Sequence, residues 1–314
     1  MNERVAIRGL TKQFGPLLAV DNLSLSVGKG EVLGFLGPNG AGKSTTMRMV
    51  TGFLPPTSGT IEVCGIDIQA QPIEARKRIG YMPEGSPLYG DITPAAFLAF
   101  IAGIRGLSGA DREAKIASAV DKLQIADVLH QPIETLSKGY RRRVGLSQAI
   151  LHDPDVLILD EPTDGLDPNQ KHQVRSLIQS MGRDKAIIIS THILEEVESV
   201  CTRAAIIARG RIVFDGTPEA LQARSVHHNA VHIRVPVTFA DRTKMVLSGI
   251  DTVERVTSGE PGAGGVAFEA VPKSGRSIIE MVSARIHAEG IPVDHMAVSH
   301  GQLDEVFREL TRLH

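Results

Sequence analysis

The chain has 314 residues and a formal net charge of −2 at pH 7, from 34 Lys and Arg against 36 Asp and Glu. That length can form two domains with sizeable cores, and the near-neutral charge gives no general reason to expect nucleic acid as a partner. Two cysteines far apart in the sequence favour a reducing compartment. We expect the chain to be soluble by itself, because it shows no signal-peptide segment and its longest apolar segment, residues 95–104, is too short to span a bilayer.

Two segments near the start alternate apolar and polar residues as strands do. They cover residues 4–8 and 23–27, and a Gly-Lys-Gly turn at residues 28–30 follows them. Phe14 lies between the two segments. Its ring could stack on a nucleotide base, because every base offers a π-face, but a lone aromatic residue is more often part of a core. Both roles stay open on this residue alone.

A glycine-rich loop then joins a strand to a helix. Residues 32–36 predict a short buried strand, and residues 45–50 are apolar at helical spacing. The loop at residues 37–44 reads GPNGAGKS, a full match to G-x-x-x-x-G-K-[ST]. In this context it forms a phosphate cradle, because backbone N–H groups and the helix N-terminus attract phosphate oxygens. Lys43 would reach the β- and γ-phosphates, and the Ser44 hydroxyl would ligate Mg²⁺.

A helical segment follows the first strands. From residue 94 to about residue 129 the apolar spacing is helical, with a glycine-containing break, which predicts a helical insert between core strands. The sequence Leu-Ser-Lys-Gly-Tyr at residues 136–140 opens another helix, which runs through residue 150. Two basic runs, at residues 76–78 and at Arg141-Arg142-Arg143, are expected to be solvated helix faces, as such runs usually are.

Two later strands end in side chains suited to catalysis. Residues 156–159 lead into Asp160 and Glu161, and residues 186–190 lead to His192, which would share the same sheet edge. Open α/β sheets bind ligands at the C-terminal ends of their strands. Asp160 fits the Mg²⁺-linked acid of a P-loop NTPase, and Glu161 is the candidate that polarises water. An Asp-Glu pair by itself would more often cap a helix than form a catalytic site, but the presence of a phosphate loop in the same chain favours the catalytic role.

The rest of the chain predicts a second, smaller domain. A polar linker near residues 223–229 precedes a βαββαβ order, which is the ferredoxin-like arrangement. His227, His228 and His232 raise the question of a metal site, but no carboxylate or Cys spacing completes one. The expected elements are strands 231–235, 252–257, 265–271 and 291–297, helices 239–247 and 275–288, and a last helix at 302–312.

Together, these motifs resemble the nucleotide-binding subunit of an ABC transporter, over residues 4 to about 218. The resemblance implies an α/β fold, with a P-loop NTPase core of the ABC ATPase type, an antiparallel β subdomain and a helical subdomain at about residues 86–150. This ATP-binding domain would cover residues 1–222. A small C-terminal α+β, ferredoxin-like domain at residues 230–314 would be accessory or regulatory. The implied activity is ATP hydrolysis, with ATP and Mg²⁺.

The resemblance also assigns roles to individual residues. Lys43, Glu161 and His192 would be catalytic, with His192 contacting the γ-phosphate in its own subunit. Ser44, Asp160 and Glu84 would hold the metal. Ser137 and Gly139 would contact ATP held by a partner subunit, and Asp167 would lie at the dimer seam. The nucleotide-binding residues would be Phe14, Gly37, Pro38, Asn39, Gly40, Ala41, Gly42, Lys43, Ser44, Thr45, Ser137, Gly139 and Asp167.

The chain departs from the family pattern at three places. Lys138 and Tyr140 replace the usual Gly and Gln of the signature, and Glu84 stands where the family mostly has Gln. A carboxylate at position 84 can ligate Mg²⁺, or it can face the permease and pair with a cation there. We favour the second role because the proline and glycines around it suit a moving loop at residues 85–90.

The implied function is an ATP-hydrolysing subunit that dimerises around two ATP molecules and drives a separate membrane permease. Each chain has one phosphate loop and one signature, so a signature aimed at phosphate must act across an interface, in a homodimer or a paired cassette. We expect no nucleic-acid partner, and a cytoplasmic protein held peripherally at the inner face of the membrane by its permease. Residues 81–84 and 303–307 resemble exporter subunits of the gliding-motility and drug-resistance type.

Two other classes of function compete with transport. Soluble ABC proteins that act on ribosomes or DNA usually carry tandem cassettes or long coiled-coil insertions, and the sequence shows neither, nor a basic stripe. A regulatory ATP-binding module that hydrolyses little would use the βαββαβ domain as its sensor. Basal ATPase activity separates that module from a motor.

Overall fold

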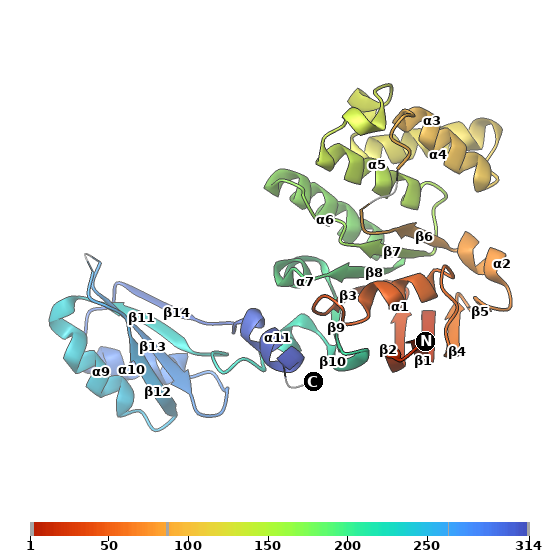
Figure 1. The fold of residues 1–314 in the computed structure, drawn as a ribbon. Helices are drawn as coiled ribbons and strands as arrows, with labels where there is room; N and C mark the ends of the chain where they lie inside the picture. The colour runs from red at the N-terminus through yellow and green to blue at the C-terminus, as the bar shows by residue number, and fades with distance from the viewer. Residues whose placement is uncertain (1–2, 86–87, 263, 313–314) are drawn as a thin grey trace. The chain divides into compact units, whose positions relative to one another are not determined.

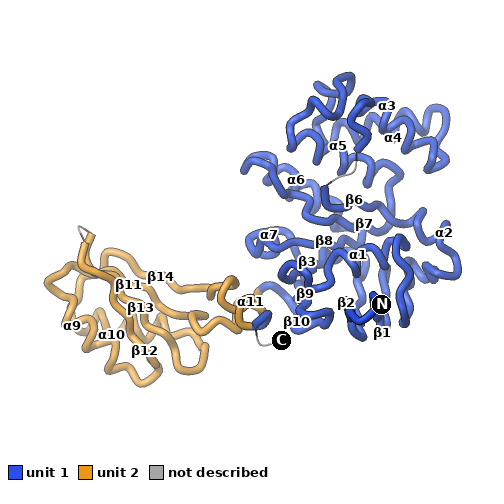
Figure 2. The backbone as a smooth tube through the Cα atoms, in the orientation of Figure 1, with its two compact units in different colours: residues 1–218, 310–314 blue, residues 219–309 orange. Residues whose placement is uncertain are grey.

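The computed structural model describes residues 3–85, 88–262 and 264–312. The chain forms two compact units, which are coloured separately in Figure 2. Unit 1 comprises residues 1–218 and 310–314, and unit 2 comprises residues 219–309. Residues 86–87, at the start of the expected helical subdomain and in the loop after Glu84, lie outside the described residues.

A six-stranded sheet forms the centre of unit 1 (Figure 1). Its order is β10-β9-β3-β8-β7-β6, and the neighbours from β9 to β6 are parallel, whereas β9 and β10 form an antiparallel hairpin. Every residue of β3, β7 and β8 is buried, as expected of parallel strands covered on both faces. The strands are β3 (Val32–Leu36), β6 (Ile79–Met82), β7 (Val156–Asp160), β8 (Ala186–Thr191), β9 (Arg203–Ala208) and β10 (Arg211–Gly216).

A four-stranded antiparallel sheet with the order β2-β1-β4-β5 packs on the same core. Its strands are β1 (Glu3–Phe14), β2 (Leu17–Gly28), β4 (Ser58–Val63) and β5 (Ile66–Asp67). The first two strands are longer than the expected segments 4–8 and 23–27, because pairing continues to Phe14 and Leu17 through several register shifts. Such irregularities interrupt the period-two alternation without ending the strand. Helix α1 (Lys43–Val50) contributes Met47, Met49 and Val50 to the shared core.

Helices surround the central sheet of unit 1 (Figure 1). They are α2 (Pro72–Lys77), α3 (Pro94–Ile104), α4 (Gly109–Leu123), the 3₁₀ turns Ala126–Val128 and Ile133–Thr135, α5 (Lys138–Ile150), α6 (Pro168–Gly182) and α7 (Leu194–Val200). In the described part of the chain, no helix combines the length and apolarity needed to cross a membrane.

One expectation about the basic runs is wrong. Arg142 and Arg143 are buried, with 5% and 8% of their surface exposed, whereas residues 76–78 are exposed as predicted. The Arg142 guanidinium donates to the Asp164 carboxylate at 3.2 Å and to its carbonyl at 3.3 Å. Arg143 donates to the carbonyls of Leu123 and Gln124 at the end of α4. Arg141 is exposed as predicted, whereas Arg142 and Arg143 are buried because these neighbours, distant in the sequence, accept from part of each guanidinium.

Unit 2 has the βαββαβ order expected from the sequence. Its antiparallel sheet has the order β12-β13-β11-β14. Val231, Ile233 and Val235 of β11 are buried in a core shared with both helices, while His232 and Arg234 alternate with them on the exposed face. The elements are β11 (Val231–Val235), the 3₁₀ turn Val237–Phe239, α9 (Ala240–Ser248), β12 (Val253–Ser258), β13 (Val266–Pro272), α10 (Ile279–Ala288) and β14 (His295–Val298); the helices α8 (Pro218–Gln222) and α11 (Leu303–Arg312) flank them.

The histidines that raised the metal question have other partners. His227 Nδ1 lies 2.7 Å from Glu269 Oε1, and His232 Nε2 lies 3.7 Å from the same oxygen. His228 Nδ1 lies 3.0 Å from the His300 carbonyl. Within the ranges that the structure describes, no group of three or more His, Cys, Asp or Glu side chains could hold a metal ion. The carboxylate near His227 and His232 comes from β13, which no local spacing in the sequence reveals.

Candidate active site

The glycine loop lies between the end of β3 and the start of α1, as the sequence predicts. Gly40 and Gly42 have φ of 80° and 110°, a left-handed backbone that glycine adopts without a steric penalty. A Cβ atom on Gly42 would lie 2.6 Å from the Ala19 carbonyl, and one on Gly37 would overlap the Ile207 carbonyl. Positions 37 and 42 therefore accept glycine only, and the backbone N–H groups of such a loop can approach a phosphate.

Lys43 is the buried cation of this loop, with 7% of its surface exposed. Its Nζ donates to the Gly37 carbonyl at 2.6 Å and to the Pro38 carbonyl at 3.2 Å. Burial lowers the pKa of the Lys43 ammonium, and the carboxylates of Glu161, Asp160 and Glu84 oppose that shift, in this order of strength. The structure thus brings three predicted acids close enough to the loop for their negative charges to raise the pKa of Lys43 against the effect of burial.

The acids come from the ends of neighbouring strands. Asp160 ends β7 and is 3% exposed; burial raises its pKa, and the negative charges of Glu84 and Glu161 raise it further. Glu161 has a φ of 49°, a conformation that residues other than glycine rarely adopt and that is found at functional sites. Its N–H donates to the Ser190 carbonyl of β8 at 2.9 Å, which fastens it beside the next strand.

His192 and Glu161 meet at the edge of the sheet. The His192 Nδ1 atom lies 2.8 Å from Glu161 Oε1, because Asp160 and Ser190 are paired in the parallel strands β7 and β8. The Glu161 side chain is 17% exposed and that of His192 is 55% exposed. With its proton on Nδ1, the imidazole donates to the carboxylate and fixes the orientation of Glu161.

A cavity of 480 Å³ is lined by Lys43, Asp160 and Glu161 and by residues of the β1–β2 hairpin. Phe14 lines it and is 43% exposed, so its ring is not a core residue, and the Lys12 ammonium lies 5.0 Å from the ring centroid. Four predicted site residues near it, Gly37, Pro38, Ala41 and His192, are not among the residues that line this cavity. Those residues are Phe14, Leu17, Leu18, Ala19, Asn39, Gly40, Gly42, Lys43, Ser44, Thr45, Glu84, Asp160, Glu161 and Arg209.

The signature residues do not line this cavity; each has a local role in the single chain. The Ser137 hydroxyl caps α5 by accepting from the Tyr140 N–H at 3.3 Å, and the Asp167 carboxylate caps α6 by accepting from the Gln170 N–H at 2.9 Å. A Cβ atom on Gly139 would overlap the Gln170 amide. Lys138 pairs with Asp164 at 3.0 Å.

Comparison with known proteins agrees with this site. Residues 20–164 match the model of the family described as "ABC transporter". The Nod factor export ATP-binding protein I of Burkholderia orbicola is 36% identical over 242 residues, which are 77% of this chain and 80% of that relative. The chain belongs to the ABC transporter ATP-binding family.

Other members extend the comparison. The probable multidrug ABC transporter ATP-binding protein YbhF of Escherichia coli is 37% identical over 224 residues; the match covers 71% of this chain but only 39% of that relative's length. A solved ATP-binding subunit of an ABC transporter has a TM-score of 0.65 at 29% identity and covers 69% of this chain and 91% of its own. A dimeric bacterial ABC transporter cassette has a TM-score of 0.64 at 20% identity, over 68% of this chain and 98% of its own, and supports the fold.

The cavity of this ABC ATPase fits its cofactors, ATP and Mg²⁺. A loop that a Cβ would fill at Gly37 and Gly42 can cradle phosphates, and the buried Lys43 can neutralise them. The Ser44 hydroxyl and the Asp160 carboxylate line the same cavity and are oxygen donors of the kind that Mg²⁺ prefers. Glu84 lines it as well, so both roles considered for Glu84 remain proposals.

The sequence did not single out Leu17, Leu18 or Arg209, which also line this cassette's cavity. Leu17 and Leu18 follow the turn at Gly15 (φ 54°). They belong to a part of the β1–β2 hairpin in which register shifts interrupt the alternation of apolar and polar residues that predicts a strand. Arg209 precedes Gly210 in the β9–β10 turn, far along the chain, and shows no local signal of a binding role.

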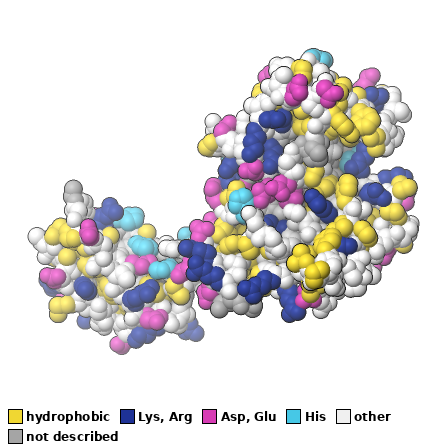
Figure 3. Space-filling model, in the orientation of Figure 1, with side chains coloured by type: hydrophobic (Ala, Val, Ile, Leu, Met, Phe, Trp, Pro, Cys, Tyr) yellow, Lys and Arg dark blue, Asp and Glu magenta, His cyan; other side chains and the backbone are white. Residues whose placement is uncertain are grey.

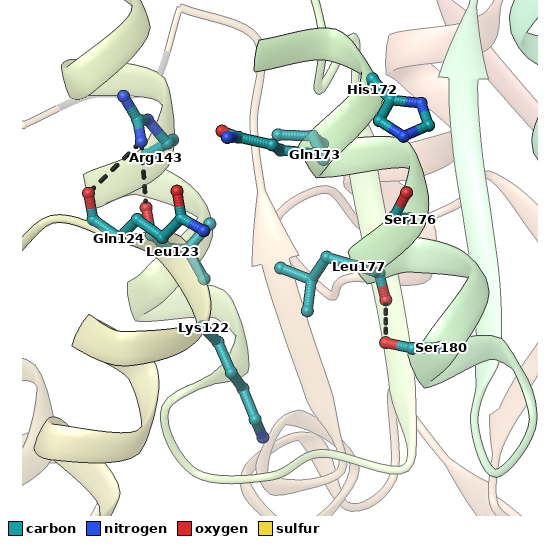
Figure 4. Close-up of a pocket in the computed structure, with 10 residues that line it drawn as sticks. Lys122, Leu123, Gln124, Arg143, His172, Gln173, Ser176, Leu177 and Ser180 are labelled. Atoms are coloured by element: carbon teal, nitrogen blue, oxygen red, sulfur yellow. Dashed lines mark hydrogen bonds between the residues drawn. The ribbon is translucent and has the colours of Figure 1, made fainter. Parts of the chain in front are cut away.

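A second cavity of the cassette, of 360 Å³, lies between α6 and the segment where α4 ends (Figure 4). Arg143 points to the carbonyls of Leu123 and Gln124 on one side, and Ser180 donates to the Leu177 carbonyl on the other. None of the predicted site residues lines this cavity. The phosphate loop and its acids are gathered in the 480 Å³ cavity instead.

Proposed function

We propose that this chain is the ATP-hydrolysing subunit of an exporter, which pairs with a second cassette around two ATP molecules and drives a separate membrane permease. The contact between Glu161 and His192 beside the phosphate loop carries the catalytic part of this proposal. Its relatives named as multidrug and Nod factor export ATP-binding proteins favour the exporter over a regulatory ABC ATPase, which is the alternative.

The residues suggest a division of labour in hydrolysis. Lys43 and the loop N–H groups bind the β- and γ-phosphates, and Ser44 and Asp160 hold Mg²⁺, which neutralises phosphate charge when it is bound. Glu161 takes the proton of the attacking water, because it is the carboxylate oriented by a second group. As an imidazolium, in which both ring nitrogens donate, His192 holds Glu161 in place through its Nδ1–H and offers its Nε2–H to the γ-phosphate. Ser137, Gly139 and Asp167 act on the nucleotide of the partner cassette.

A groove on unit 1 is our candidate for the permease contact. It has a volume of 410 Å³ and lies between α2, α3 and the strand β6. Phe53, Ile73 and Ile104 line it and are 71%, 67% and 66% exposed. Arg76, Lys77 and Arg105 add positive charge to its lining. Figure 3 shows hydrophobic side chains gathered between α3 and α2. An amphipathic helix of a permease with an acidic residue complements such a groove.

Charge substitutions in the groove test the transport role. Ile73→Glu and Ile104→Glu place an unpaired carboxylate in the apolar contact, so each should reduce the amount of chain that co-sediments with native membranes by about tenfold or more. Met245→Glu is the matched control, because Met245 is 76% exposed on unit 2, outside the groove. ADP binding by each purified variant checks its folding.

Two results would contradict the proposal. If the wild-type chain does not associate with membranes in the cells that make it, the regulatory alternative is favoured. If both groove variants sediment with membranes as the wild type does, the permease contact lies elsewhere.

A further inference from the structure

The turn between β9 and β10 is fastened to the nucleotide cavity at two points. The Gly210 N–H donates to the Ala41 carbonyl of the phosphate loop, and the Asp21 N–H of β2 donates to the Gly210 carbonyl, both at 2.9 Å. A Cβ atom on Gly210 would lie 3.0 Å from the Ala19 carbonyl. Arg209 therefore stands at a defined place, between the phosphate loop and the hairpin that carries Phe14.

Arg209 differs from the other arginines of its hairpin. Arg203 pairs with Asp215 and Glu31, and Arg211 pairs with Asp21. Arg209 is exposed, lines the nucleotide cavity and has no ion-pair or hydrogen-bond partner among the residues that the structure describes. Its φ of 46° is a left-handed conformation that residues other than glycine rarely adopt.

The lining of the cavity combines two kinds of chemistry. Lys43, Asp160 and Glu161 supply charges suited to phosphates and a metal ion, whereas Phe14, Leu17 and Leu18 supply apolar surface suited to a base. Gly210, the residue after Arg209, is hydrogen-bonded to Ala41 of the phosphate loop and lies beside Ala19 of the hairpin, so Arg209 lines the cavity where these two segments meet.

We propose that Arg209 binds the ribose–α-phosphate portion of the nucleotide held by the phosphate loop. This rests on the nucleotide site of the proposed function and adds a residue to it. A guanidinium donates to phosphate and hydroxyl oxygens in a rigid fork. The α-phosphate does not react, so Arg209 holds substrate and transition state equally; its loss raises KM and leaves kcat unchanged.

The test removes the guanidinium without disturbing the turn. Arg209→Asn suits this purpose, because asparagine tolerates a positive φ better than most residues. The KM for ATP and the Kd for ADP should each rise about tenfold, the effect of one charge-assisted hydrogen bond, with kcat changed by less than about twofold. Inhibition by pyrophosphate, which has neither ribose nor α-phosphate, should be unchanged. Arg209→Lys keeps the charge and should recover part of the affinity.

Arg211→Gln is the matched control on the same turn, because Arg211 pairs with Asp21 and does not line the cavity. It should bind ADP as the wild type does. The proposal is overturned if Arg209→Asn binds ADP as tightly as the wild type, if its kcat falls while KM stays constant, or if the lysine variant is as weak as the asparagine variant. A wild-type chain that binds no ADP would instead refute the nucleotide site itself.

Discussion

Replacing Glu161 by Gln removes a base while it keeps the size of the side chain. The amide can still contact His192, now 2.8 Å from Glu161 Oε1, and Gln adopts the φ of 49° no less readily than Glu. What is lost is the capacity to accept a proton from water. General-base catalysis contributes roughly 10²–10⁴ in rate, so we expect a loss of about 3–5 kcal/mol of transition-state stabilisation.

The substitution also changes the charge around Lys43. The Glu161 carboxylate is the strongest of the three that raise the pKa of Lys43 against the effect of burial. Its removal lowers that pKa further, so the ammonium loses its proton at a lower pH. In Glu161→Gln, ADP affinity should therefore begin to fall at a lower alkaline pH than in the wild type, while affinity at neutral pH is retained.

Three measurements examine this reasoning. Single-turnover hydrolysis gives the rate loss, ADP titration from neutral to alkaline pH gives the shift in affinity, and size-exclusion chromatography with ATP and Mg²⁺ reports an ATP-bound dimer that hydrolysis no longer releases. A hydrolysis rate within about threefold of the wild type would remove Glu161 from the base role. A variant that remains monomeric with ATP at high concentration would contradict the shared-site dimer.

Four further predictions concern the same chain. Lys43→Ala should abolish hydrolysis, because it deletes the cation of the phosphate loop; wild-type turnover in this variant would refute the assignment of the loop. Asp160→Asn should remove Mg²⁺-dependent hydrolysis yet raise the melting temperature near neutral pH by a few degrees, because the pKa of Asp160 is raised in the folded state and its ionisation therefore opposes folding. The increase in melting temperature should shrink as the pH falls toward the carboxyl pKa; an increase that grows as the pH falls would refute this reasoning. Glu84→Gln should raise the Mg²⁺ requirement of the isolated chain several-fold if Glu84 holds metal, or abolish stimulation by the permease if it couples the two, and no change in either quantity refutes both roles. Deleting residues 230–314, which include most of unit 2 and the last five residues of unit 1, should leave ADP binding intact, because every predicted site residue precedes residue 218; a folded truncation that binds no ADP would show that the deleted residues contribute to the site.

The phosphate loop and the central strands were predictable because their determinants are local. A buried parallel strand is a short apolar run, and the cradle needs glycines, Lys43 and Ser44 at fixed spacing between a strand and a helix. Asp160 and Glu161 at the end of β7 and His192 after β8 follow from the same logic, since each is found where an apolar run stops. The βαββαβ order of unit 2 was likewise readable from alternating and helical periods.

The features that could not be predicted from the sequence depend on contacts between segments far apart in the chain. Arg142 and Arg143 resemble a solvated run, yet both are buried, because Asp164 and carbonyls at the end of α4 accept hydrogen bonds from them. The contact of Glu161 with His192 needs the register of β7 on β8, and the place of Arg209 needs the hydrogen bonds of Gly210 to the phosphate loop and to β2. Local periodicity indicates whether a segment prefers helix or strand and which of its residues prefer burial. A contact between side chains far apart in the chain forms only when the sheets assemble, because packing and hydrogen bonding then determine which partners each residue meets.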